Sequence, residues 1–260
     1  MYLDKNPMMD FSHKQLLITG GIGGIGTAIA LIMAKKGCKV FIFDIVDEGA
    51  ARVEELNQEL GEDLLVYYNV DLRDKESLKA QVNHLIQEHG DIDFLVNNAA
   101  IDTIGQIETM SDEIYEETQQ INAKAAFLLC REILPSMRRL GGGAIVNVSS
   151  IILSGGWEGR VPYAMAKGSL LGLTRALARE VGKENIRVNA VSPGAIPTAM
   201  ERKFWKDDRT ELDQFILDRQ SLKFRGSVDD IANAVEFLLS EKSRFITGHD
   251  LHVNGGWYMG

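Results

Sequence analysis

The sequence has little cysteine, fewer basic than acidic residues, and no long apolar run. Only Cys38 and Cys130 occur among the 260 residues, too few for a disulfide framework or a thiolate metal site. We therefore expect a protein of the reducing cytoplasm. The five histidines repeat no metal-binding spacing such as HExxH, so no metal site is expected either.

The charge balance is acidic. Lys and Arg number 28 against 37 for Asp and Glu, a net charge of −9, which argues against nucleic acid or an anionic membrane as a partner. No window has the length and apolar character of a membrane span, and the first residues lack the apolar centre of a signal peptide. We expect residues 1–10 to form a short N-terminal extension and residues 11–260 a single domain.

Strand-like and helix-like stretches alternate along the chain. With 45% hydrophobic residues, the chain can build a full core. This alternation predicts an α/β fold with a parallel sheet of about seven strands and helices on both faces. Such folds bind ligands beyond the carboxyl ends of the strands. The strands are expected near residues 14–19, 39–43, 64–69, 93–97, 144–148, 186–191 and 250–253.

A glycine-rich turn, Thr19–Gly26, lies between the first strand and a helix-like run. Glycines at such a turn let backbone amides approach a pyrophosphate at the positive end of the helix. The second strand ends in Asp44, roughly 20 residues further on, where an acid that binds ribose is expected. The two features together predict a dinucleotide site.

The stretch from Gly143 to Lys167 reads as a strand, a turn with Ser150, and a helix opened by Pro162. Tyr163 and Lys167 are four residues apart and would share a face of that helix. A free phenol has a pKa of about 10, and a nearby cation can lower it enough for the group to act as a base. In an arbitrary sequence, a helix-surface pair explains the same spacing.

Taken together, the motifs resemble the short-chain dehydrogenase/reductase family in its short single-domain form. The resemblance runs from about Phe11 to the C-terminus and implies a single Rossmann-like doubly wound domain. The matching motifs, in the order of the family, are Thr19-Gly20-x-x-x-Gly24-x-Gly26, Asn97-Asn98-Ala99, Asn122, Ser150, Tyr163-x-x-x-Lys167 and Pro193-Gly194-x-x-x-Thr198.

The resemblance implies a catalytic set. Ser150, rather than Ser149 on the other side of the strand, would hydrogen-bond the substrate oxygen, and Tyr163 would exchange its proton. Lys167 would lower the pKa of the phenol and hold the nicotinamide ribose. Asn122, in a helix expected over 111–139, would stabilise a break in that helix and hold a water that relays protons; an isolated asparagine is otherwise an ordinary surface residue.

The resemblance also implies the cofactor contacts. Asp44 would accept hydrogen bonds from ribose hydroxyls and repel a 2′-phosphate, so NAD(H) is expected rather than NADP(H). Asp71 would contact the adenine, although it could equally cap the next helix. Ala100 stands where the family usually has glycine. The expected contacts are Gly20, Gly24, Ile25, Gly26, Asp44, Asp71, Leu72, Asn97, Asn98, Ala99, Tyr163, Lys167, Pro193, Gly194, Ile196 and Thr198.

Two stretches are candidates for contact with the substrate. Residues 199–225, with Met200, Phe204 and Trp205, would form a lid that is mobile without ligand, although a plain amphipathic surface helix explains the same pattern. The loop with Trp157, Glu158 and Arg160 would face the substrate or be structural. The charges of both stretches, with Asp102, favour a small polar alcohol, sugar or hydroxy acid.

Other readings of the whole chain remain open. A reductase of 3-oxoacyl thioesters on a carrier protein would use Arg138 and Arg139 as basic surface for an acidic partner, and a catalytically silent dinucleotide-sensing regulator would keep only the fold. Members of the family are typically tetramers or dimers, so we expect a homotetramer or a dimer. Residues 257–260 could then reach a neighbouring subunit.

Overall fold

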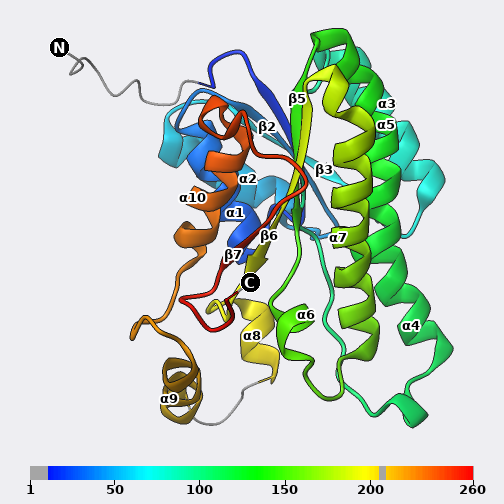
Figure 1. Cartoon of the computed structure of the whole chain (residues 1–260). Coiled ribbons are helices and arrows are strands. Elements are labelled where there is room, and N and C mark those ends of the chain that lie inside the picture. Colours follow the sequence, from blue (N-terminus) through cyan, green and yellow to red (C-terminus); the bar gives the residue numbers. More distant parts are fainter. Residues whose placement is uncertain (1–10, 205–208, 260) are drawn as a thin grey trace.

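The computed structural model of the chain describes residues 11–204 and 209–259 (Figure 1). Its centre is a sheet of seven strands in the order β3-β2-β1-β4-β5-β6-β7, all paired in parallel. The sheet confirms the predicted fold, and each strand begins and ends within two residues of its predicted bounds. The strands are β1 (Gln15–Thr19), β2 (Lys39–Asp44), β3 (Leu65–Asn69), β4 (Phe94–Asn97), β5 (Gly143–Val148), β6 (Ile186–Pro193) and β7 (Asp250–Val253).

Helices connect the strands and cover both faces of the sheet. Among the described residues, none of these helices is long and apolar enough to cross a membrane. The helices are α1 (Gly24–Ala34), α2 (Gly49–Leu60), α3 (Lys75–His89), α4 (Asp112–Gln119), α5 (Ala125–Leu140), α6 (Ile152–Gly155), α7 (Val161–Val181), α8 (Ala199–Phe204), α9 (Arg209–Arg219) and α10 (Val228–Leu239).

Two apolar clusters form the core, one on each side of the sheet. On one side α1, α2 and α10 pack through side chains such as Ile29, Leu56 and Val235. On the other side α3, α5 and α7 pack through side chains such as Leu85 and Ile133 (Figure 1). Because both faces are covered, the strands are continuous apolar runs rather than alternating ones.

The strand order reverses between β1 and β4, which is where a doubly wound sheet binds its ligand. The glycine turn follows β1 and Asn98 follows β4, so both lie at this point. The short helices α6 and α8, with α9, gather beyond the same end of the sheet (Figure 1).

The helix expected over 111–139 is not continuous. One turn of π-helix, Gln120–Lys124, separates α4 from α5 and contains Asn122. Single π-helical turns inside α-helices often mark functional positions. The interruption lies at Asn122, where the resemblance implied a break in the helix. The short helix α6, in what the sequence indicated as a loop, was not predicted.

Candidate active site

One cavity of about 1190 Å³ lies at the carboxyl ends of the strands. Pockets that bind one drug-sized ligand measure roughly 300–1,000 Å³, so this cavity has room for a dinucleotide and a small second molecule. Every expected site residue lines it except Asn97 and Asn122. The motifs that the sequence spreads from Gly20 to Thr198 therefore meet in one place.

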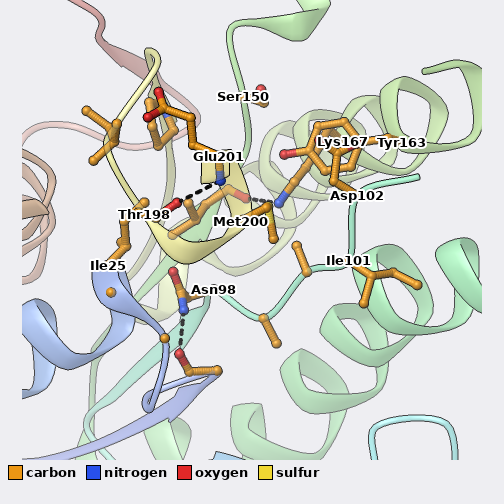
Figure 2. Close-up of a pocket in the computed structure, with 18 of the residues that line it drawn as sticks. Ile25, Asn98, Ile101, Asp102, Ser150, Tyr163, Lys167, Thr198, Met200 and Glu201 are labelled. Carbon is orange, nitrogen blue, oxygen red and sulfur yellow. Dashed lines mark hydrogen bonds between the residues drawn. The ribbon is translucent and has the colours of Figure 1, made fainter. Parts of the chain in front are cut away.

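The glycine turn is shaped by close backbone contacts. Gly20 has a φ of +66°, and a side chain at Gly26 would bring its Cβ within 2.1 Å of the Gly20 carbonyl oxygen. Asn98 donates from Nδ2 to the carbonyl oxygens of Thr19 and Gly20, both at 3.0 Å, and so holds the turn against the end of β4 (Figure 2). Within the described part of the chain, no side chain caps the start of α1, so its first amides are available to an anion such as a pyrophosphate.

Asp44 lies beside this turn at the end of β2. Its carboxylate accepts hydrogen bonds from the backbone amides of Ile22 at 3.0 Å and Ile45 at 2.8 Å. These two contacts fix the carboxylate at the wall of the cavity and leave it further lone pairs for a ligand. The residues after Asp44 that line the cavity, Ile45 and Val46, are apolar.

Asp71 lines the cavity after β3 but does not cap the following helix. That helix, α3, is capped by Asp74, whose carboxylate accepts from the amides of Glu76 and Ser77. Asp71 instead pairs with the guanidinium of Arg73, which also contacts Glu117 at 2.8 Å. The alternative that Asp71 is a helix cap is therefore wrong, and Arg73 is a cavity residue that the sequence did not indicate.

Asn97 and Asn98 have different surroundings. Asn97 is buried, and its Nδ2 donates to Oδ1 of Asn147 on β5 at 2.8 Å. It belongs to the core between the strands and does not line the cavity, in contrast to the expected position. Consecutive residues of a strand face opposite sides, and this alternation alone could have separated the two asparagines.

Tyr163 and Lys167 lie one turn apart on α7 and point into the cavity (Figure 2). The Lys167 ammonium lies 5.6 Å from the centroid of the Tyr163 ring and donates to the Val148 carbonyl oxygen at 2.7 Å. Ser150 lines the same cavity, and its side chain lowers the pKa of the Tyr163 phenol. Ser149 is buried instead and donates to the Lys167 carbonyl oxygen at 3.3 Å, in agreement with the choice of Ser150.

The electrostatics of the pair differ from the expectation. Burial raises the pKa of the Tyr163 phenol, and the Ser150 hydrogen bond and the charge of Arg160 only partly oppose it. Burial also lowers the pKa of Lys167 to about 7. The lysine is therefore largely neutral above that pH, and in the protein without ligand it does not lower the pKa of the phenol as expected.

Asn122 lies behind the cavity wall rather than in it. Its side chain is buried and makes two hydrogen bonds to one residue: the Ile101 amide donates to Oδ1 at 2.8 Å, and Nδ2 donates to the Ile101 carbonyl oxygen at 2.7 Å. Ile101 does line the cavity. Asn122 thus joins the π-helical turn to the loop after β4 and positions the wall next to it.

The turn after β6 closes the cavity beside the glycine turn. Pro193, Gly194, Ile196 and Thr198 all line it, and a methyl group at Gly24 would lie 3.4 Å from Cγ2 of Thr198. Thr198 also accepts from the Glu201 amide at 3.4 Å and so begins α8 (Figure 2). The stretch that the sequence predicted to cover the substrate contributes Ala199, Met200, Glu201, Leu212, Phe215 and Ile216 to the lining, while Trp205 lies outside the described residues.

The remaining wall contains an ion pair and an aromatic cluster. Arg160, at the start of α7, pairs with Asp102 in the loop after β4. Trp157 and Trp257 also line the cavity, with ring centroids 5.5 Å apart. The position of Trp257 in the cavity of its own chain was not predicted, because this contact joins residues a hundred positions apart. Among the described residues, no group of three His, Cys, Asp or Glu side chains could hold a metal ion.

The seven-stranded parallel sheet, with a cavity at the carboxyl ends of its strands, defines a Rossmann-like fold, and comparison with known proteins agrees. Residues 20–258 match the sequence model of the family described as enoyl-(acyl carrier protein) reductase. The chain is 34% identical to a Rhizobium meliloti protein named "Probable galactose dehydrogenase GalD", covering 98% of this chain and 99% of the other. It is 35% identical to the 3-oxoacyl-[acyl-carrier-protein] reductase FabG of Escherichia coli, covering 96% and 100%.

Solved structures of related enzymes share the fold. The crystal structure of levodione reductase superposes with a TM-score of 0.89 at 31% identity, covering 95% of this chain and 98% of the other. The chain belongs to the short-chain dehydrogenase/reductase family, as its motifs indicated. It is an oxidoreductase of that family, and the alternative of a catalytically silent regulator has no support.

Proposed function

We propose that the protein interconverts a secondary alcohol and a ketone with NAD(H), and that Tyr163 is its acid and base. The observation that carries the proposal is the convergence of Ser150, Tyr163 and Lys167 on one cavity that also receives the glycine turn. A bound nicotinamide accepts or supplies the hydride of this chemistry. The residues of the chain bind and orient the substrate and the cofactor, and they move the proton.

In this mechanism Ser150 donates a hydrogen bond to the reacting oxygen of the substrate. Tyr163, which lines the same cavity as Ser150, takes the hydroxyl proton during oxidation and returns it during reduction. Lys167 is held by the Val148 carbonyl oxygen, which places its ammonium beside the phenol and leaves other N–H bonds for ribose hydroxyls. The pKa of Lys167, lowered to about 7, lets it exchange a proton near neutral pH.

NAD(H) is the proposed cofactor because of Asp44. Its carboxylate is fixed by two backbone amides where a ribose would bind, and it would repel a 2′-phosphate. Arg73, the described basic residue that lines the cavity after β3, is already paired with Asp71 and Glu117. We propose adenosine contacts for Asp71 and Leu72, and pyrophosphate contacts for the turn from Gly20 to Gly26.

The cofactor assignment is tested by titrating the protein with NADH and NADPH and following fluorescence. NADH should bind at least about tenfold more tightly, because like charges held close together without water between them repel strongly. Asp44→Ser should reduce or reverse the preference, and Asp47→Asn, which removes an exposed charge three residues away, should not change it. Tighter binding of NADPH to the unmodified protein would refute the assignment.

For the substrate we propose a small polar alcohol, sugar or hydroxy acid. The support is the charged wall formed by Asp102 and Arg160, and the relative named as a galactose dehydrogenase. The relative named as a 3-oxoacyl-[acyl-carrier-protein] reductase supports the second candidate function. Arg138 and Arg139, the basic surface expected for it, pair with Glu184 and Asp91 at the end of α5 remote from α6 and α8 (Figure 1).

We further propose a cytoplasmic homotetramer or dimer. Cys38 and Cys130 are both buried and free, and burial raises the pKa of the Cys130 thiol to about 12, so neither is suited to forming a disulfide. The oligomer is proposed from the family resemblance, and sedimentation would measure it directly.

The proposed reaction is tested with NAD-linked oxidation of a panel of polyols, sugars, hydroxy acids, apolar secondary alcohols and 3-hydroxyacyl thioesters. Turnover of at least one alcohol, lost in Tyr163→Phe, is the expected result. Best activity on the thioesters would favour the carrier-protein reductase instead. If no compound of the panel were oxidised, the proposed reaction would be wrong.

A further inference from the structure

The carboxylate of Asp102 is buried, and only one of its two oxygens has a partner among the described residues. Its side chain is 5% exposed, and one oxygen, Oδ2, pairs with Arg160. The other oxygen, Oδ1, is buried and has no hydrogen-bond partner among the described residues. A buried carboxylate oxygen without a donor is strongly unfavourable, so this position calls for a donor that the described residues do not supply.

The wall that carries Asp102 is held in place from two sides. The loop after β4 is joined to the loop before α7 by a backbone hydrogen bond from Gly105 to Gly159 at 3.0 Å, as well as by the Asp102–Arg160 ion pair. The base of the first loop is fixed by the two bonds between Asn122 and Ile101. Asp102 therefore has little freedom to turn elsewhere for a partner.

This wall lies next to the proposed reacting group. Arg160 is the residue just before α7, three positions before Tyr163, and its charge acts on the phenol. Asp102 and Tyr163 both line the cavity. A substrate with its reacting oxygen at Tyr163 would thus present its neighbouring groups to Asp102.

The charges around the cavity disfavour an anionic substrate. Its described lining contains six carboxylates and three basic side chains, and each basic side chain is already engaged: Arg73 with Asp71 and Glu117, Arg160 with Asp102, and Lys167 with the Val148 carbonyl. A substrate carboxylate near Asp102 would meet a like charge. A hydroxyl group would instead donate to Oδ1 and give this oxygen the hydrogen-bond partner that it lacks.

The lining of the cavity also offers apolar surface. Trp257 packs edge-on against Trp157, at 5.5 Å, and against Phe215, at 6.2 Å between ring centroids, and all three line the cavity. Aromatic rings of this kind suit a molecule that has hydroxyl groups on its edge and C–H groups on its faces. Sugars and cyclic polyols have this combination.

We infer that the substrate is a neutral polyhydroxylated molecule, a monosaccharide or a cyclic polyol, and that Asp102 selects it by accepting a hydrogen bond from a hydroxyl other than the reacting one. The inference rests on the proposed function and narrows it. It excludes the hydroxy acids and the thioesters, and it assigns a specificity-determining role to Asp102.

The test pairs a change in the protein with a change in the substrate. The wild-type protein and Asp102→Ala are assayed with NAD on a neutral hexose and on its deoxy analogues, each lacking one hydroxyl. With the wild type, kcat/KM for one analogue should be about tenfold to a hundredfold lower than for the hexose. With Asp102→Ala, kcat/KM for the two compounds should differ by less than about threefold. Glu54→Gln, which removes an exposed carboxylate on α2, is the matched control and should keep the full loss.

A binding measurement keeps the test independent of turnover and of folding defects. Calorimetric titration of the hexose into Tyr163→Phe saturated with NAD should give binding that the same deoxy analogue loses. Asp102→Asn, which removes the charge and keeps the shape, should raise kcat/KM for a hydroxy acid relative to the hexose.

The outcomes separate this inference from the proposed function. Best turnover of hydroxy acids, thioesters or apolar alcohols would overturn the inference and leave the proposed oxidoreductase intact. An equal loss for the deoxy analogue with the wild type and Asp102→Ala would also overturn it. Failure of every alcohol in the panel would refute both.

Discussion

Asn122 holds Ile101 by both of its backbone polar groups, at 2.8 and 2.7 Å, across the junction between the π-helical turn and the loop after β4. The amide of the Asn122 side chain thus pairs with the Ile101 backbone as the backbone of a neighbouring strand would, with one bond donated and one accepted. Because Ile101 lines the cavity and Asp102 follows it, this contact sets the position of the wall that faces the substrate.

A second asparagine provides a control for the first. Asn57 makes the same two bonds to the backbone of Leu65, at 3.0 and 2.8 Å, but on α2 and β3, away from the cavity lining. Asn122→Ala should lower the free energy of unfolding by about 2–4 kcal/mol, because it leaves two polar groups unpartnered, and Asn57→Ala by a similar or smaller amount. Only Asn122→Ala should also lower kcat. Denaturant unfolding and steady-state kinetics measure the two effects, and an equal loss of kcat in both variants would contradict the assigned role.

The pKa of Tyr163 should depend on the cofactor. Burial raises it in the free protein, so the tyrosinate absorbance that is lost in Tyr163→Phe should appear above pH 10. Binding of the positively charged nicotinamide should move that titration to lower pH, since a cation favours the phenolate. Alcohol oxidation should accordingly rise with pH to a plateau whose apparent pKa is below that of free tyrosine.

The charge of Arg160 contributes to the same titration. Arg160→Gln should raise the pKa of Tyr163 further in the free protein, and Arg131→Gln, an exposed arginine on α5, should leave it unchanged. A titration of Tyr163 that Arg160→Gln does not alter would contradict this part of the mechanism.

Lys167 should make the stability of the protein depend on pH in a defined direction. Its pKa falls from 10.5 to about 7 on burial, so between these values the unfolded chain binds a proton that the folded chain does not. The free energy of unfolding should therefore rise with pH by about 1.4 kcal/mol per unit, relative to Lys167→Met, from pH 7 upward. Lys79→Met, at an exposed position on α3, should run parallel to the wild type. A constant difference between the wild type and Lys167→Met across this range would show that the lysine is not buried as described.

The stretch after Thr198 should become more protected when NAD binds. Arg225 joins α8 to α9 by pairing with Glu201 and Asp213, and it donates to the Ala195 carbonyl oxygen at 3.3 Å. Amide hydrogen exchange over 199–204 and 209–225 should slow with NAD in the wild type and remain fast in Arg225→Gln. Arg175→Gln, at an exposed position on α7, serves as the control. Exchange that NAD does not change would refute closure of this stretch.

Much of the fold could be predicted because its signals are local. Apolar runs, the glycine turn and the spacing of Tyr163 and Lys167 each depend on a few consecutive residues, and these predicted the strands and the place where they meet. Asn97 shows the limit of motif matching, since it belongs to a family motif and yet turns into the core. Its neighbour Asn98 holds the glycine turn.

The parts that the sequence did not predict depend on distant residues. The pair formed by Asp102 and Arg160 spans 58 positions, and no local pattern relates the two. The same holds for Trp257 against Trp157, and for Arg73, whose partner Glu117 lies 44 positions further along the chain. The raised pKa of Tyr163 likewise follows from burial, and the spacing of Tyr163 and Lys167 in the sequence does not indicate how deeply the phenol is buried.

The most direct test of the account removes a single oxygen atom. Tyr163→Phe keeps the ring and loses the hydroxyl, so NADH should bind to it nearly as tightly as to the wild type, while kcat for the best alcohol of the panel falls by roughly 10²–10⁴-fold. Tyr115→Phe, an exposed tyrosine on α4, should retain full activity. Parallel measurement of NADH binding and NADH formation in the three proteins decides the question: lost turnover with retained binding is the predicted result, and substantial turnover by Tyr163→Phe would contradict the mechanism.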